Sequence, residues 1–290
     1  MRLFLLTALT MIAFAANSVL NRMALADGGI DAASFGTIRL IAGAVMLGAL
    51  CALLRGGLQL RGPARVAGVL SLLLYIYGFS AAYDVLDAGI GALILFGVVQ
   101  ITMFAGSLIA REPVPQRRWI GATVAFGGLV WLLWPGAGLQ VSVLHGLFMA
   151  AAGIGWGVYS LAGRRSTDAL QGTAANFIIA APLGVLIGLA LPAGAGGTVI
   201  GMQGVMLAIL SGAVTSGLGY ALWYHVLPGL ASSVAAVAQL TVPVIAMAGG
   251  MIFLGEMLSL QFVMASALVL GGVAISVLPV QQMIRRSSGS

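Results

Sequence analysis

The stretch TVPVIAMAGGMIFLGEMLSLQFVMASALVLGGVAIS, residues 241–276, decides the class of fold. It contains two long apolar runs, and its one charged residue, Glu256, follows Gly255 between them. The runs do not alternate apolar and polar residues, as the roughly ten-residue strands of a membrane barrel do. A helix needs about 20 apolar residues to cross the hydrocarbon core of a bilayer. The stretch therefore predicts two membrane-spanning helices joined by a short loop.

The rest of the chain has the same character. Of its 290 residues, 61% are hydrophobic and 7% charged, with a mean hydropathy of +1.11. A soluble domain is roughly one quarter charged, so most of this surface must face lipid. We expect ten spans, short loops and no soluble domain, with apolar runs at 3–25, 34–54, 66–85, 88–110, 118–135, 142–162, 171–191, 201–226, 230–254 and 259–280.

The arginines predict the orientation, because cytoplasmic loops are enriched in basic residues. All 13 basic residues are Arg. With a cytoplasmic N-terminus, only Arg22 and Arg39 fall toward the outer face. The predicted outer loops instead carry Asp27, Asp31, Asp84, Asp87 and Glu256. Both termini are therefore predicted to be cytoplasmic. The net charge of +6 reflects topology and not a nucleic-acid-binding surface.

The two halves of the chain resemble each other. A shift of 142 residues lays Ser18 over Ser160 and Arg22 over Arg164, and a shift of 144 residues aligns Glu112 with Glu256, Gly127-Gly128 with Gly271-Gly272, and Pro135 with Pro279. Five helices per half is an odd number, so the second copy enters the membrane inverted. Inverted repeats are typical of transporters with a substrate site near the bilayer midplane. We predict an all-α integral membrane fold of two inverted five-helix repeats, 1–137 and 138–290, in one compact domain.

Residues 241–276 resemble the ninth and tenth helices of EamA-type members of the drug/metabolite transporter superfamily. The resemblance is carried by Pro243, by Gly255-Glu256 and by Gly271-Gly272. The first half is a degenerate copy, in which Arg111-Glu112-Pro113 ends the fourth helix but no proline precedes it. Within this group the chain is most similar to the YddG-type amino-acid exporters. The resemblance implies a ten-helix exporter of the bacterial inner membrane. We expect a small-molecule substrate, no cofactor and no metal, and a chain that works as a monomer in lipid.

Polar and aromatic side chains inside the spans are the candidates for a substrate site, because such groups tend to face a wet cavity. Aromatic walls can stack on a substrate and attract an ammonium group, while amides bond its polar groups. Interfacial belts and helix packing are the alternative roles of these residues. The predicted substrate-binding residues are Asn17, Tyr75, Phe79, Tyr83, Gln100, Trp156, Tyr159, Ser160, Tyr220, Tyr224 and Gln239.

Other features suggest structural roles. Pro182 and Pro243 lie within apolar runs and should kink their helices, which makes them candidate hinges. Glu112 and Glu256 end their helices, and we expect each carboxylate to cap the next helix. Arg39 should pair with an outer aspartate such as Asp84 or extend to the interface; binding a substrate carboxylate is the other possibility.

Alternative functions have little support in the sequence. Neither H-E-x-x-H nor G-x-S-x-G occurs, which disfavours an intramembrane enzyme. The Asp27/Asp31 and Asp84/Asp87 pairs only faintly resemble the diphosphate sites of membrane prenyltransferases. A channel, or an exporter of other metabolites or cationic drugs, remains an alternative. No acidic residue lies near the middle of a predicted span, which favours the metabolite over the cationic drug.

Overall fold

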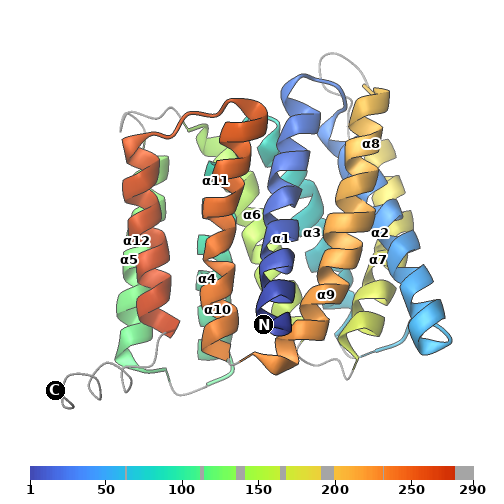
Figure 1. Cartoon of the computed structure of the whole chain (residues 1–290), viewed down its shortest axis with the longest axis horizontal. Coiled ribbons are helices and arrows are strands. Elements are labelled where there is room, and N and C mark those ends of the chain that lie inside the picture. Colours follow the sequence, from blue (N-terminus) through green and yellow to red (C-terminus); the bar gives the residue numbers. More distant parts are fainter. Residues whose placement is uncertain are drawn as a thin grey trace.

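The computed structural model describes residues 1–62, 64–111, 114–134, 141–163, 168–190, 199–230 and 232–277. Within these ranges the chain is a bundle of helices (Figure 1), and the β-structure is limited to one isolated bridge between Ile30 and Ile200. The helices are α1 (Arg2–Ala26), α2 (Ala32–Arg55), α3 (Arg65–Tyr83), α4 (Ala88–Ile109), α5 (Gln116–Leu133), α6 (Val143–Gly163), α7 (Ala169–Ala190), α8 (Met202–Leu210), η1 (Ser211–Leu218), α9 (Gly219–Val226), η2 (Leu227–Gly229), α10 (Ser232–Gln239), α11 (Thr241–Leu254) and α12 (Leu260–Val277).

Each predicted apolar run coincides with one helix or with a stack of consecutive short helices. Eight segments among the described residues are long and apolar enough to cross a membrane. The other two predicted spans are less complete. Helix α5 begins with Gln116-Arg117-Arg118, and the apolar part of α12, Leu260–Ser276, is shorter. The all-helical membrane fold is thus confirmed.

Two of the predicted spans are not uniform α-helices. The eighth consists of α8, the π-helical η1 and α9, and the ninth is interrupted at Leu240 between α10 and α11. Pro243 occupies the first turn of α11, where a missing N–H costs nothing because no intrahelical acceptor exists for it. Pro182, by contrast, lies inside α7, which is helical on both sides of it.

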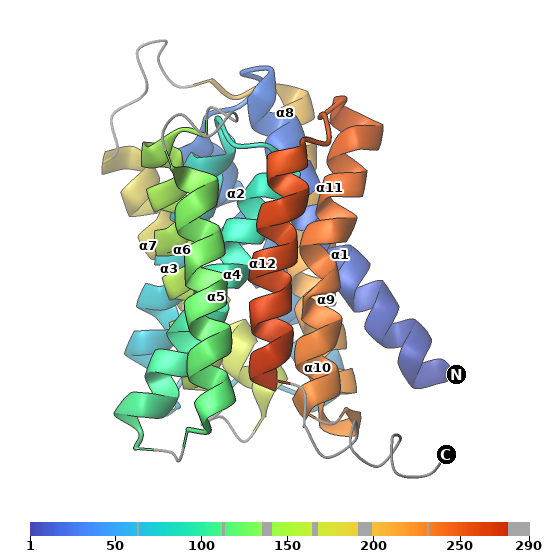
Figure 2. The same cartoon turned by 90° about the vertical axis from the view of Figure 1, so that its left-hand side faces the viewer.

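Close packing depends on small residues. Helices α5 and α12 lie together at one end of the bundle (Figures 1 and 2), and a Cβ on Gly121 or Gly272 would strike the backbone of the partner helix. Gly153 and Gly157 of α6 likewise face α4, where a Cβ would strike Val98 or Thr102, so their lack of a side chain permits the close approach. Further neighbours are α3 with α6, α2 with α7, α1 with α11, and α4 with α11.

The bundle has two distinct faces. We call one the bridge face, because there the α1–α2 loop pairs with residues 199–201 through Asp31 N–Val199 O (3.0 Å) and Gly201 N–Gly29 O (2.8 Å). We call the opposite one the pocket face; it carries the α2–α3 loop and the start of α7 (bottom of Figure 1). Helix α1 begins and helix α12 ends toward the pocket face (Figures 1 and 2).

Candidate substrate site

A small cavity lies between α1, α3, α4, α6 and α9. Its volume is about 20 Å³, and it is lined by Phe14, Asn17, Ser18, Tyr75, Phe79, Leu95, Phe96, Trp156 and Tyr220. A cavity of this size holds about one water molecule. Helices from both halves of the chain form its wall, so a movement between the halves would change its size directly.

Aromatic rings make up most of the wall. The Trp156 ring lies 5.0 Å from both the Tyr75 and the Tyr220 ring, and the Phe14 ring meets the Tyr220 ring edge-on at 5.8 Å. Offset and edge-to-face pairs at these distances are favourable. Tyr75 and Phe79 lie one turn apart on α3, which is why their side chains share one face. The rings form a compact lining in which an apolar substrate group could replace ring–ring contacts.

Asn17 connects this wall to the π-helix. Its Oδ1 accepts hydrogen bonds from Ser211 Oγ (2.8 Å) and Thr215 Oγ1, and lies 3.5 Å from Ser216 Oγ. A π-helical turn is rare and is often found at functional sites. Here its wider turn brings three hydroxyl groups toward one amide, and the arrangement fixes the Asn17 side chain at the cavity wall.

Arg39 lies behind the same wall, and the expectation that it pairs with Asp84 or reaches the interface is wrong. Its side chain is completely buried, with Nε donating to Ser216 Oγ (3.1 Å) and Nη2 to Tyr75 Oη (2.9 Å). The guanidinium carbon lies 5.2 Å from the Tyr75 ring centre and 5.0 Å from that of Phe79. The reason is geometric: Arg39 faces the bundle interior, where the tyrosine hydroxyl and two rings replace water.

The energetic position of Arg39 is unusual. No carboxylate among the described residues pairs with it, and its Nη1 has no hydrogen-bond partner. An arginine at the centre of a span costs about 2.5–3.5 kcal/mol on insertion scales. Two cation–π contacts of about 0.5–2 kcal/mol each offset much of this cost, but neither ring supplies a negative charge. The guanidinium is held in place, but it is not neutralised.

A larger pocket opens on the pocket face. It has a volume of about 170 Å³, and its polar lining includes Arg65, Tyr159, Thr173, Asn176 and Tyr224. Arg65 donates through Nη1 to Asn176 Oδ1 (2.6 Å) and to Gly172 O (2.7 Å). The ring of Tyr159 stacks on that of Trp156 at 5.4 Å. Two stacked rings therefore stand between this pocket and the central cavity.

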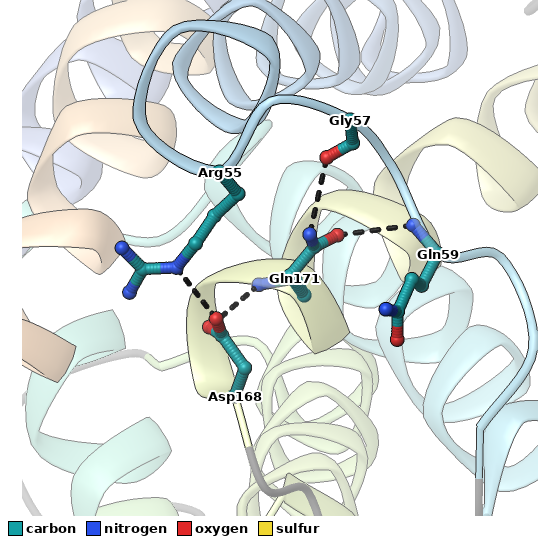
Figure 3. A network of polar contacts seen from close by, with 5 residues as sticks. All are labelled: Arg55, Gly57, Gln59, Asp168 and Gln171. Atoms are coloured by element: carbon teal, nitrogen blue, oxygen red, sulfur yellow. Dashed lines mark hydrogen bonds and ion pairs between the residues drawn. The ribbon is translucent and has the colours of Figure 1, made fainter.

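A polar network closes part of the pocket rim (Figure 3). Asp168 accepts from Arg55 Nε (2.6 Å) and from the backbone N of Gln171 (3.1 Å), and the side chain of Gln171 bonds to Gly57 O and Gln59 N. Burial on its own would raise the pKa of Asp168, but the hydrogen bonds from Arg55 and Gln171 outweigh it and leave the pKa lowered. The network joins α2 and its following loop to the first turn of α7.

The bridge face is closed differently. The buried hydroxyl of Tyr83 donates to Ala88 O (3.2 Å), Asn21 donates to Ser80 (3.3 Å), and Arg22 donates to the carbonyl oxygens of Tyr83 and Asp84. None of these residues borders the two cavities described above, although Tyr83 packs on Phe79, which does. The contacts tie α1, α3 and the start of α4 together on this side.

Glu256 also acts at the bridge face. Its Oε1 accepts from Ala88 N (2.6 Å), so it caps α4; the predicted cap of the next helix, α12, is made instead by Ser259. The left-handed Gly255 and the bond from Glu256 N to Gly250 O turn the chain back and direct the carboxylate across the bundle. Burial raises the pKa of Glu256 despite the bond from Ala88. Glu112 lies outside the described residues.

Comparison with known proteins agrees with this architecture. The sequence model of the EamA-like transporter family matches the chain twice, over residues 1–134 and 144–278. The chain belongs to the EamA-like transporter family. It is 44% identical over 281 residues to the uncharacterized protein PA1977 of Pseudomonas aeruginosa, covering 96% of this chain and 95% of that protein. One solved structure, described only as the crystal structure of a protein, matches 97% of this chain and 98% of its own with a TM-score of 0.62 and 21% identity.

In this EamA-like transporter, the structure brings together most of the residues singled out from the sequence. Asn17, Tyr75, Phe79, Trp156 and Tyr220 line the central cavity. Tyr159 and Tyr224 line the pocket, and Tyr83 packs on Phe79 at 4.7 Å, on the side toward the bridge face.

Three predicted residues lie apart from both cavities. Ser160 is half-buried and donates to the carbonyl of Trp156 (2.7 Å), while Gln100 and Gln239 are half-buried on α4 and α10 and line neither space. Placement in a span alone did not indicate the direction of these side chains.

Several cavity residues were not predicted. Phe14, Leu95 and Phe96 are ordinary apolar residues, so no sequence signal separates them from packing residues. Ser211 and Thr215 do not line the cavity but bind Asn17, which does. They were detectable in principle, since their spacing of four places two hydroxyls on one helical face of an otherwise apolar span.

Proposed function

We propose that this EamA-like transporter exports small polar metabolites, amino acids above all, by alternating access through the central cavity. The observation that carries the proposal is the composition of the cavity wall, to which α1, α3 and α4 contribute from one half of the chain and α6 and α9 from the other. A site at such an interface is what a pair of moving halves requires.

The proposed architecture is two inverted five-helix repeats, 1–137 and 138–290. The two family matches support it. The helix neighbours support it as well: the contact of α3 with α6 corresponds to that of the eighth span with α1, and the contact of α4 with α6 corresponds to that of α11 with α1. Such exchanged neighbours are expected when the first to fifth spans correspond to the sixth to tenth. Under this proposal Pro182 and Pro243 are hinges.

The proposed location is the bacterial inner membrane, with both termini in the cytoplasm and the monomer as the working unit. The arginine distribution supports this orientation, because Arg2, Arg55, Arg61, Arg65 and Arg111 all lie at ends of helices or in loops on the pocket face. The pocket then opens to the cytoplasm. It is the entrance for a substrate to be exported.

The lining disfavours cationic drugs as substrates. None of the residues around the central cavity is acidic, so a cation without a carboxylate would meet no counter-charge there. Neutral and aromatic amino acids suit the wall better, because their side chains can stack on Tyr75, Trp156 and Tyr220. Facilitated, downhill export is the simplest coupling scheme for such a site.

Counterflow in proteoliposomes tests the proposal. Vesicles loaded with an unlabelled amino acid should accumulate the labelled one, with saturation and preference for one enantiomer. Flux that does not saturate would indicate a pore, and absence of flux for every amino acid in the panel would reject the substrate class. Flux that rises steeply with a pH gradient at zero voltage would reject facilitated export.

A further inference from the structure

Arg39 is a buried charge for which the described part of the protein provides no opposite charge. It is fully buried on α2, and no hydrogen bond is formed by its Nη1. The two groups that do bind it, Tyr75 and Ser216, are neutral. A buried guanidinium is normally paired with a carboxylate or phosphate, often through two parallel hydrogen bonds.

We propose that Arg39 binds the carboxylate of the transported molecule. The inference rests on the transport function proposed above and specifies its substrate class: a small organic carboxylate with an apolar or aromatic body. A neutral amino acid satisfies this description, whereas the corresponding amine or amide does not.

The contacts of Arg39 give the carboxylate a route from the cavity. Tyr75 is at once the hydrogen-bond partner of Arg39, one of the two rings beneath its guanidinium, and part of the cavity wall. The Tyr220 hydroxyl lies 3.5 Å from that of Tyr75. A rotation of the Tyr75 side chain would therefore both enlarge the cavity and expose Nη1 and Nη2 to it, and a carboxylate would replace the Tyr75 oxygen.

Asn17 supplies a second donor on the same wall. Its Oδ1 is occupied by the hydroxyls of the π-helix, which turns the Nδ2 end of the amide away from them. Ser216 connects the two groups, since its hydroxyl accepts from Arg39 and lies near Asn17. The π-helix thus holds the Arg39 guanidinium and the Asn17 amide at a fixed spacing. Together they provide one charged and one neutral donor for a single carboxylate.

The experiment uses the full chain in proteoliposomes and compares four competitors of one transported amino acid: the acid itself, its N-acetyl derivative, its amide and its decarboxylated amine. The acid and the N-acetyl derivative should inhibit counterflow, and the amide and amine should be weaker by about tenfold or more, as expected for loss of one charge-assisted interaction.

Variants locate the effect. Arg39→Gln should reduce counterflow by about tenfold or more and bring the acid-to-amide ratio close to 1, while Arg39→Lys should retain part of both because it keeps the charge without the bidentate geometry. Arg22→Gln is the matched control, because Arg22 is the other arginine toward the bridge face and its hydrogen bonds within the described residues go to backbone carbonyls. It should leave the ratio unchanged.

Thermal stability in detergent separates binding from a purely structural role. If Arg39 serves the substrate, Arg39→Gln should melt at or above the wild-type temperature, and the amino acid should no longer raise it. A lower melting temperature with an unchanged acid-to-amide ratio would assign Arg39 to the structure alone. Equal competition by the acid and the amide in the wild type would by itself overturn the role of Arg39, but it would leave the proposed transport function intact. If the wild type moves no amino acid, the proposed function itself fails.

Discussion

The two faces of this transporter close in different ways. On the bridge face, main-chain hydrogen bonds join residues 29–31 to residues 199–201, Arg22 binds two carbonyl oxygens, and Glu256 caps α4. On the pocket face, the described residues leave a space of about 170 Å³ that reaches Tyr159. The difference is that backbone pairing closes the bridge face, whereas the pocket face is open as far as the stacked rings of Tyr159 and Trp156.

This contrast fits one half of an alternating-access cycle. A carrier must open each face in turn, and lid and gate movements often limit its rate. The bridge face should therefore open only when its backbone pairing and the α4 cap separate, and the pocket face should close over the stacked rings. The following predictions test this contrast, beginning with the largest expected effect.

Locking the bridge face should stop transport. Ile30 and Ile200 face each other in a non-hydrogen-bonded antiparallel pair, whose Cα atoms are roughly 4.5 Å apart, within the range of about 4.4–6.8 Å for disulfides. In the double variant Ile30→Cys/Ile200→Cys, oxidation should lower counterflow by on the order of tenfold or more, because each cycle needs this face to open. A reductant should restore it.

The single-cysteine variants under the same oxidant are the controls, since the native Cys51 is buried. An oxidised double variant that transports at the reduced rate would show that the substrate leaves by a path that does not separate residues 30 and 200. The asymmetry between the faces would then have no part in the cycle.

The sequence predicted the helices and the aromatic lining of the cavity better than the contacts that close the bridge face and hold Arg39. Helix positions followed from apolar runs, because in lipid a backbone without water must satisfy its hydrogen bonds within each span. The aromatic lining followed from Tyr75/Phe79 spacing and from Trp156 and Tyr220. The partner of Arg39, the helix capped by Glu256 and the π-helix did not follow, because each depends on contacts between residues more than 30 positions apart or on a local change of helical pitch.

Removing one of the two rings that separate the pocket from the central cavity should weaken transport next most strongly. Trp156→Ala should join the pocket to the central cavity and lower transport efficiency by about tenfold, through loss of ring contacts with Tyr75 and Tyr220. Initial counterflow rates at several substrate concentrations measure it.

Trp119→Ala is the matched control, because Trp119 is half-exposed on α5, packs on Phe104 and lines neither cavity. It should leave the rates within about twofold. Equal losses in both variants would mean that Trp156 contributes only to packing.

Glu256 should favour the closed bridge face. Glu256→Ala removes the oxygen that accepts from Ala88 N, a cap of about 0.5–2 kcal/mol, so labelling of a cysteine placed at Asn21, behind the seal, should accelerate about two- to thirtyfold. Asp87→Asn is the control, since Asp87 precedes α4 but makes no side-chain cap. If both variants accelerate labelling alike, the effect comes from surface charge and not from the cap.

The smallest effect is an opposite pH dependence at the two faces. The pKa of Asp168 is lowered in the folded protein. Its contribution to the free energy of unfolding is therefore present above its ordinary pKa of about 3.9 and is lost as the pH falls through the folded value. The pKa of Glu256 is raised by burial, with Asp87 adding to the shift and Arg22 opposing it. The protonated Glu256 therefore contributes to the free energy of unfolding, fully below about pH 4.3, and this contribution is lost as the pH rises through the folded value.

Melting temperatures of the wild type, Asp168→Asn and Glu256→Gln between about pH 3 and 7 separate the two contributions. The melting-temperature difference between the wild type and Asp168→Asn should be small and should shrink on acidification, because the Arg55–Asp168 pair is partly exposed to solvent. On acidification the melting temperature of the wild type should rise relative to that of Glu256→Gln. Parallel curves would mean that the faces respond to protons alike, whereas diverging curves mean that acid loosens the pocket face while it tightens the bridge face. A proton gradient across the membrane would then shift the balance between the two states even if no proton is carried with the substrate.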